Sequence, residues 1–168
     1  MTELQELRRY RRDLHRIPEL DFDLPQTIAY IEGVLAPLTC EVTHPCPNCV
    51  CAFFDAGVDA AHATAIRADM DALPVTEQTG LPFASCHEGV MHACGHDGIV
   101  ASALVLARIL AEEGEVFPVR MRFLFEPAEE IGEGAKRMLA AGALDGEPDI
   151  FLMFHYAVDQ SFGMAVHE

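Results

Sequence analysis

Short apolar segments alternate with helical patterns along the chain, and this alternation restricts the possible fold more than any other feature. Strand-like segments are expected at 49–54, 63–68, 119–125 and 149–155. One further strand precedes them, and helices are expected at 99–110 and 132–144, on either side of the third segment. Nearly continuous apolar strands that alternate with helices are typical of a mainly parallel sheet covered on both faces. The sequence therefore predicts an α/β fold.

Two helices are expected at the N-terminal end. Thr2 and Gln5 match a capping box at the start of the first helix, where apolar residues then recur every three or four positions. Pro18 ends this helix, and Pro25 begins the second one.

Composition restricts the class of protein. The 168 residues are 51% hydrophobic, which is enough for one domain with a packed core. A net charge of −16 argues against nucleic acid and anionic membranes as partners. We find no leader pattern and no apolar run of membrane length, which predicts a cytoplasmic protein. Six cysteines in that compartment predict reduced thiols or metal ligands rather than a disulfide framework.

Residues 91–97 read Met-His-Ala-Cys-Gly-His-Asp and hold the densest group of metal-binding residue types in the chain. They directly precede the helix at 99–110, which places Cys94, His96 and Asp97 at its start, with Asp97 as the expected N-cap. Cys and His are ligands of zinc-like ions, and a helix N-terminus favours a thiolate. The alternative is a Cys packed at a strand–helix corner beside two histidines with satisfied hydrogen bonds. The density of the group favours a metal site.

Acidic residues and one further histidine follow the predicted strands. Asp69 and Asp71 follow one strand, Glu129 and Glu130 follow the next, and His155 closes the last. Sites in parallel sheets form beyond the carboxyl ends of the strands, so these side chains are expected at the same edge as the 91–97 group. The alternatives are a capped turn for the two aspartates and a solvated acidic turn for the two glutamates. Beside the Cys-Gly-His group, the glutamate pair instead suits one metal ligand and one free base, as hydrolysis by an activated water requires.

Residues 40–51 contain Cys40, Cys46, Cys49 and Cys51. The Cys46-Pro-Asn-Cys49 spacing fits half a zinc site or a redox pair. A thioredoxin-type pair should open a helix, whereas here a strand-like segment follows. We therefore interpret this segment as a turn between two strands.

Three segments resemble motifs of one known family. They read Arg-Ala-Asp-Met-Asp-Ala-Leu-Pro at 67–74, Met-His-Ala-Cys-Gly-His-Asp at 91–97 and Phe-Glu-Pro-Ala-Glu-Glu at 125–130. They resemble the aminoacylase, hippurate hydrolase and auxin-conjugate hydrolase family of dinuclear metal-dependent amidohydrolases. Residues 11–19 resemble the N-terminal helix and turn of the same family, so the likeness covers nearly the whole chain. It implies a three-layer αβα catalytic domain like that of zinc peptidases, with a mainly parallel or mixed sheet.

The resemblance implies two divalent metal ions, which could be zinc, manganese or cobalt. Carried over motif by motif, the ligands are Cys94 (bridging), His96, Glu130 and His155. Glu129 would be the general base that deprotonates a metal-bound water, and it would then pass the proton to the leaving amine. Asp71 matches an acid beside the metals with a supporting role. The implied substrate is an N-acyl amino acid or a small peptide.

The chain departs from the family pattern at several positions. Ile99 stands where members commonly have His, Glu126 stands where they commonly have Gln, and the Cys-rich segment replaces a glycine-rich turn. Family members continue into a lid or dimerisation domain and a closing catalytic segment that supplies another His ligand. Residues 1–168 are therefore expected to be the N-terminal part of a catalytic domain that is truncated here. The likeness is compatible with a homodimer of the full-length protein.

The main interpretation is a metal-dependent amidohydrolase. One alternative is a catalytically inactive binding or regulatory fragment with the same fold. The other is a structural zinc or redox protein that uses the cysteines of residues 40–51.

Overall fold

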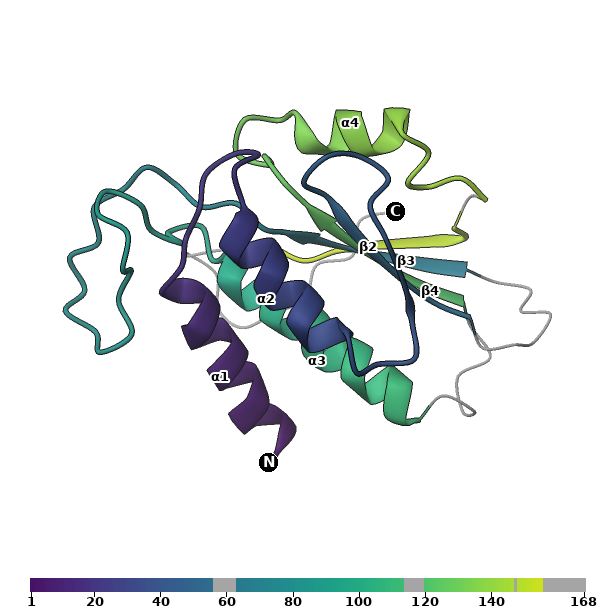
Figure 1. Cartoon of the computed structure of the whole chain (residues 1–168), viewed down its shortest axis with the longest axis horizontal. Coiled ribbons are helices and arrows are strands. Elements are labelled where there is room, and N and C mark those ends of the chain that lie inside the picture. Colours follow the sequence, from purple (N-terminus) through teal and green to yellow (C-terminus); the bar gives the residue numbers. More distant parts are fainter. Residues whose placement is uncertain (56–62, 114–119, 147, 156–168) are drawn as a thin grey trace.

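A mixed five-stranded sheet forms the centre of the computed structural model, which describes residues 1–55, 63–113, 120–146 and 148–155 (Figure 1). The helices are α1 (Glu3–His15), α2 (Pro25–Leu35), α3 (His96–Glu112) and α4 (Gly134–Ala140). The strands are β1 (Glu41–Thr43), β2 (Val50–Phe54), β3 (Ala63–Asp69), β4 (Arg120–Glu126) and β5 (Ile150–Met153). The predicted order of helices and strands is confirmed.

The strands are arranged in the order β1-β2-β4-β3-β5, so β4 lies between two strands that are consecutive in sequence. β1 and β4 both pair antiparallel with β2, whereas β4 and β5 pair parallel with β3. The predicted α/β sheet is therefore confirmed as a mixed one. In the parallel pair, Asp69 lies beside Glu126, so both strands bring acidic residues to the same edge.

Helices cover the sheet on both faces, as predicted for a three-layer fold. Figure 1 shows α1, α2 and α3 on one side of the sheet and α4 on the other. The larger core lies under the first three helices and includes the fully buried Phe123 and Phe125. The smaller core lies under α4, where Leu124 packs with Met138 and with Cys46, Cys49 and Cys51. Alternate residues of β4 thus serve the two cores, because successive side chains of a strand point to opposite faces.

The N-terminal helix signals act as predicted, but the start of α3 differs. Thr2 and Gln5 form the expected capping box, and Pro25 begins α2. α3 begins at His96 after Gly95, whose φ of 97° is left-handed and suits glycine. The prediction of Asp97 as N-cap is therefore wrong. Asp97 lies one residue inside the helix, because this glycine turns the chain one step earlier.

The remaining boundaries differ by a few residues. α4 is shorter than the predicted 132–144. The sequence also predicts Met138 and Leu139 in the core, but only Met138 is buried, and Leu139 is 56% exposed. Adjacent side chains of a helix point about 100° apart, and here Met138 is the one that faces the smaller core. β5 is shorter than the predicted 149–155, and β4 begins at Arg120, since Val119 lies outside the described residues.

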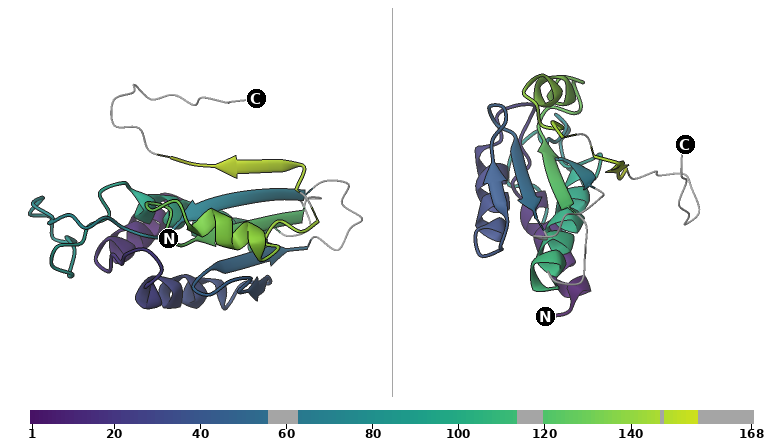
Figure 2. Two further views of the ribbon diagram at one scale, coloured as in Figure 1. Left: turned by 90° about the horizontal axis from the view of Figure 1, so that it is seen from above. Right: turned by 90° about the vertical axis from the view of Figure 1, so that its right-hand side faces the viewer.

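β5 is the strand that the helices leave uncovered. Ile150, Phe151, Leu152, Met153 and the following Phe154 are each between 41% and 57% exposed. Figure 2 shows β5 at the edge of the sheet, which agrees with its pairing to β3 alone. Within the described ranges, no helix has the length and apolar character needed to cross a membrane.

Candidate metal centre

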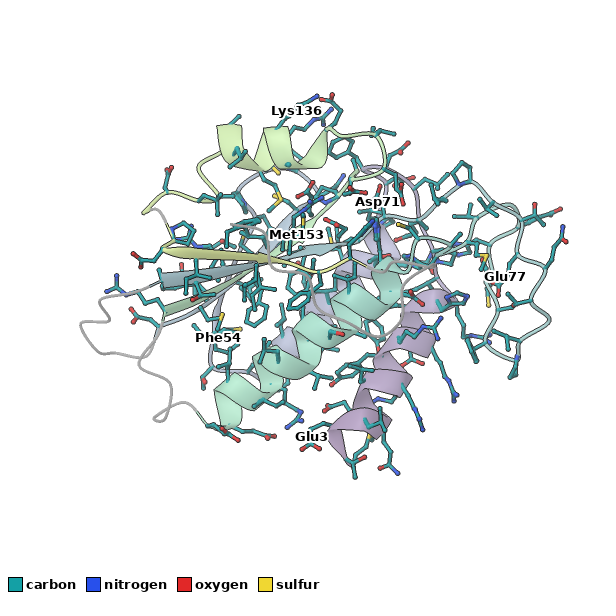
Figure 3. All side chains as sticks on the ribbon, turned by 180° about the vertical axis from the view of Figure 1, so that it is seen from behind. Glu3, Phe54, Asp71, Glu77, Lys136 and Met153 are labelled. Carbon is teal, nitrogen blue, oxygen red and sulfur yellow. The ribbon has the colours of Figure 1, made fainter. Side chains whose placement is uncertain are left out.

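The predicted site residues converge where β3, β4 and β5 end and α3 begins. Figure 3 shows Asp71 at this edge of the sheet, near the N-terminal end of α3. Two groups of side chains place one possible ligand atom per residue within 4.8 Å of one another. The groups are Cys94, His96 and His155, and Asp69, His96 and Glu129. No other such group occurs in the part of the chain that the structure describes.

His96 is fully buried and oriented by the backbone. Its Nδ1 lies 2.8 Å from the carbonyl oxygen of Asp71, which fixes Nδ1 as the protonated nitrogen. The other nitrogen, Nε2, is buried without a hydrogen-bond partner and lies 3.8 Å from Glu129 and 3.9 Å from Glu130. The nearer oxygen of Glu130, Oε1, is also buried and unpartnered. An imidazole nitrogen and a carboxylate oxygen that face each other without donors fit a divalent cation.

Asp71 holds the backbone of Glu129 and Glu130 through hydrogen bonds. It is completely buried, and its two carboxylate oxygens accept the backbone N–H groups of Glu129 and Glu130, each at 3.1 Å. Its Oδ1 also lies 3.6 Å from the Nδ1 of His96. Because its hydrogen bonds are to backbone amides, Asp71 positions the candidate ligands from outside the 4.8 Å groups. This geometry agrees with the expectation that Asp71 lies beside the metals and positions their ligands.

Cys94 and His155 complete the first group. The Sγ of Cys94 lies 3.9 Å from the Nε2 of His155, and the rings of His96 and His155 are 6.2 Å apart. Burial, together with the neighbouring Glu130 and Glu129 carboxylates, raises the pKa of Cys94 to about 12. A thiol surrounded by acids stays protonated unless a cation lies beside it, and a bound metal ion deprotonates it. The donor set therefore fits a metal ion.

Two residues of this region were not assigned a role from the sequence. Asp69 is buried and belongs to the second ligand group, and burial raises its pKa to about 7. Arg67 lies between acids, with Nε 2.8 Å from Asp69 and 2.7 Å from Glu126, and its NH2 group lies 3.6 Å from Glu129. The Arg-Ala-Asp sequence contained the signal, because residues two apart on a strand share a face.

A second buried network supports the start of α3. The carboxylate of Asp97 lies 2.8 Å from His15 Nδ1 and accepts a hydrogen bond from Arg11 Nε at 3.1 Å. The other nitrogen of His15 lies 3.3 Å from Glu77, in the long loop after β3 (Figure 3). This network ties α1, α3 and the loop together next to His96.

The fold and these ligand groups define a class of protein, namely an α/β domain with a candidate metal centre at the carboxyl ends of its parallel strands. Residues 65–167 match the model of peptidase family M20/M25/M40. Because this match covers more than half of the sequence, the chain belongs to peptidase family M20/M25/M40. The predicted family resemblance is thereby confirmed.

Relatives agree with this assignment. The N-acetyl-L-cysteine deacetylase of Bacillus subtilis is 44% identical over 137 residues, which are 81% of this chain and 33% of that protein. A Synechocystis protein is 44% identical over 146 residues, which are 86% of this chain and 37% of the relative. The chain thus spans about a third of the length of these curated relatives.

Solved structures show the same fold. A crystal structure from methicillin resistant Staphylococcus aureus matches with a TM-score of 0.86 and 43% identity, covering 90% of this chain and 39% of the other. A Bacillus subtilis protein described as a dinuclear metal binding peptidase from M20 family matches with a TM-score of 0.84 and 40% identity. This match covers 94% of the present chain and 44% of the Bacillus subtilis chain.

Proposed function

We propose that this chain provides the metal-binding part of a hydrolase that cleaves the amide bond of N-acyl amino acids or small peptides. One observation carries the proposal. His96 Nε2 and Glu130 Oε1 are buried without hydrogen-bond partners and face each other at 3.9 Å, beside Cys94 and His155. The family, and the relatives described as a deacetylase and as a dinuclear metal binding peptidase, support this reading.

The residues that would hold the ions are Cys94, His96, Glu130 and His155, and the family resemblance implies that Cys94 would be shared between the two ions. A thiolate, imidazole and carboxylate set suits zinc, manganese or cobalt. When bound, the ions would polarise the amide carbonyl and increase the acidity of a water molecule. Residues 1–168 would correspond to the N-terminal part of the catalytic domain.

Glu129 is the proposed general base. Its side chain is 29% exposed, which leaves the carboxylate accessible to a water molecule, while its backbone N–H donates to Asp71. Its carboxylate would take the proton of the attacking water and deliver it to the departing amine nitrogen. The guanidinium of Arg67 lies 3.6 Å from the same carboxylate and places a positive charge beside it.

The test is the metal content of the purified 168-residue chain after dialysis against zinc or manganese, measured by inductively coupled plasma mass spectrometry. We expect the Cys94→Ala/His96→Ala double variant to lose the bound metal. The matched control is Cys46→Ser/Cys49→Ser, which should keep it. Metal retained by the first variant and lost by the second would instead assign the metal to the Cys-rich turn and refute the proposal.

Hydrolysis of a panel of N-acetyl and N-benzoyl amino acids by the metal-loaded chain separates an enzyme from a catalytically inactive domain of the same fold. We expect weak turnover from these 168 residues alone, because positioning of an amide needs cleft walls on all sides of the metal centre. Turnover near the usual enzyme value of about 10 per second would show that the described site is sufficient. Metal binding without any turnover would favour the binding or regulatory alternative.

A further inference from the structure

The Cys-rich turn between β1 and β2 has no part in the proposed function, yet its backbone has a defined hydrogen-bonded conformation. The N–H of Cys49 donates to the carbonyl oxygen of Cys46 at 3.2 Å, and Asn48 adopts a left-handed φ of 63°. This i→i+3 hydrogen bond is that of a β-turn, in which the α-carbons of the first and fourth residues, here Cys46 and Cys49, lie within about 7 Å of each other. Disulfides span about 4.4–6.8 Å between α-carbons, so the backbone suits a bond between these two cysteines.

The side chains of the turn meet as well. The Sγ atoms of Cys46 and Cys49 are 2.6 Å apart, and both residues are buried in the smaller core against Leu124 and Met138. The side chain of Asn48 donates to the carbonyl oxygen of Phe22 at 2.6 Å, which anchors the turn to the segment before α2. The two thiols are therefore held together by the fold and not only by their spacing.

A metal site is the competing explanation, and the surroundings do not favour it. Two thiolates supply half of a tetrahedral zinc site. Among the described residues, no third ligand atom lies within 4.8 Å of both sulfurs. The nearby His44 is already engaged, since Nδ1 contacts the carbonyl oxygen of Cys49 at 2.9 Å and Nε2 lies 3.1 Å from Glu32.

We infer that Cys46 and Cys49 form a reversible disulfide across this turn. The oxidant is a low-molecular-weight disulfide. The Cys46 thiol, which is the more exposed of the two, loses its proton and attacks one sulfur of the oxidant, and one small thiol leaves. The Cys49 thiol then loses its proton and attacks the Cys46 sulfur of this mixed disulfide, and the second small thiol leaves. Two protein thiols are oxidised, and one small disulfide is reduced to two thiols.

The surroundings suit a stable bond more than a rapidly exchanging one. Burial, followed by the neighbouring Cys46, raises the pKa of the Cys49 thiol to about 12. A thiol of high pKa is a poor leaving group, which slows reduction of the disulfide. The segment also continues into β2 and not into a helix, unlike a thioredoxin-type pair. The bond would therefore reinforce the turn and would not relay electrons.

The test uses the 168-residue chain incubated with glutathione disulfide, then unfolded and alkylated with iodoacetamide. We expect two thiols to escape alkylation without a glutathione adduct, and backbone fragmentation between residues 46 and 49 to be suppressed in the mass spectrum. Dithiothreitol should restore both thiols. The oxidised chain should also unfold about 4–8 °C higher than the reduced one, as expected for a short closed loop in a domain of this size.

Cys51→Ser is the matched control, because this cysteine lies in the same core two residues further along β2. We expect it to form the disulfide as the wild type does, whereas Cys46→Ser and Cys49→Ser should not. An internal disulfide that survives in Cys46→Ser would assign the bond to another pair. A wild-type chain with all thiols free, or with glutathione adducts alone, would overturn the inference. Should a serine variant fail to fold, the wild-type fragmentation pattern decides the question.

Discussion

His96 is the residue that both candidate ligand groups share. Its Nδ1 is occupied by the carbonyl oxygen of Asp71, so only Nε2 is available and it can bind one ion. A second ion would then need donors other than His96. The thiolate of Cys94 and the carboxylates beside His96 are the groups that could supply them, because a sulfur atom or a carboxylate can serve two ions while an imidazole nitrogen cannot.

The adjacent glutamates should separate base from ligand. In the full-length protein, Glu129→Gln keeps the shape of the side chain but cannot accept a proton, so turnover should fall by at least about 10²-fold while metal content is unchanged. Glu130→Gln should instead weaken metal binding, because it replaces the partnerless oxygen that faces His96. Metal affinity measured by isothermal titration, alongside turnover, checks both results. The reverse pattern would show that the two roles are exchanged.

Asp71→Asn tests how firmly the glutamate pair is held. An asparagine offers one acceptor oxygen where the aspartate offers two, and its NH2 group would then face the N–H of Glu129 or Glu130. We expect the free energy of unfolding to fall by about 1–3 kcal/mol, together with weaker metal binding. Urea unfolding provides the measurement, with the exposed Glu133→Gln as the control. An unchanged unfolding free energy would show that these hydrogen bonds do not order the loop.

Sequence patterns located the candidate metal ligands because each follows a recognisable strand or begins a helix. Asp97 was misplaced because α3 begins one residue earlier, at His96. Inside the helix its Oδ1 accepts the N–H of Gly98, and its Oδ2 contacts His15 and Arg11. The spacing of Arg67 and Asp69 indicates that they share a face, but the contact of Arg67 with Glu126 depends on which strand lies beside β3. The pairing of Asp69 with Glu126 is a property of the sheet that no local pattern contains.

At the scale of elements, His15 joins α1 to α3 and to the loop that carries Glu77. The hydrogen bond to Asp97, and then the contact with Glu77, raises the pKa of His15 above its ordinary value of 6.5. The protonated ring therefore contributes stability in full below pH 6.5, and this contribution is lost as the pH rises through the higher folded-state pKa.

Urea unfolding of wild type and His15→Gln between pH 6 and pH 9 checks this prediction. The difference in unfolding free energy should be largest at the acidic end and should shrink toward the alkaline end. His44→Gln, at a side chain that is 50% exposed, is the matched control. A difference that grows with pH would show that His15 is neutral in the folded protein.

Helix and strand types were predictable because periodicity is a property of a single segment. Their ends were less so. α4 is shorter than its apolar pattern because the chain turns tightly before it, where a Cβ on Gly134 would lie 1.7 Å from the carbonyl oxygen of Pro127. Such a close approach within the connection between β4 and α4 cannot be read from the apolar pattern of the helix.

At the scale of the whole molecule, β5 presents an apolar strand on the surface. Its four residues and Phe154 are all at least 41% exposed, and an uncovered apolar edge strand invites pairing with another chain. We expect the 168-residue chain to self-associate with rising concentration in sedimentation velocity. Ile150→Lys/Leu152→Lys should shift it toward monomer, whereas Leu139→Lys on α4 should have a smaller effect. Equal monomer content in all three proteins would contradict this prediction.

The position of β4 between β2 and β3 has a consequence for the order of events in folding. A ribosome delivers β2 and β3 before β4. β2 can pair with β1 at once, but it is joined to β3 only through β4, so the sheet cannot be completed until residues 120–126 have emerged. Pairing between strands that are far apart in sequence slows folding, and the unpaired apolar strands are meanwhile exposed to other chains. The candidate ligands at the ends of β3 and β4 come together only after that insertion. Metal capture should therefore lag behind helix formation when refolding is followed in time.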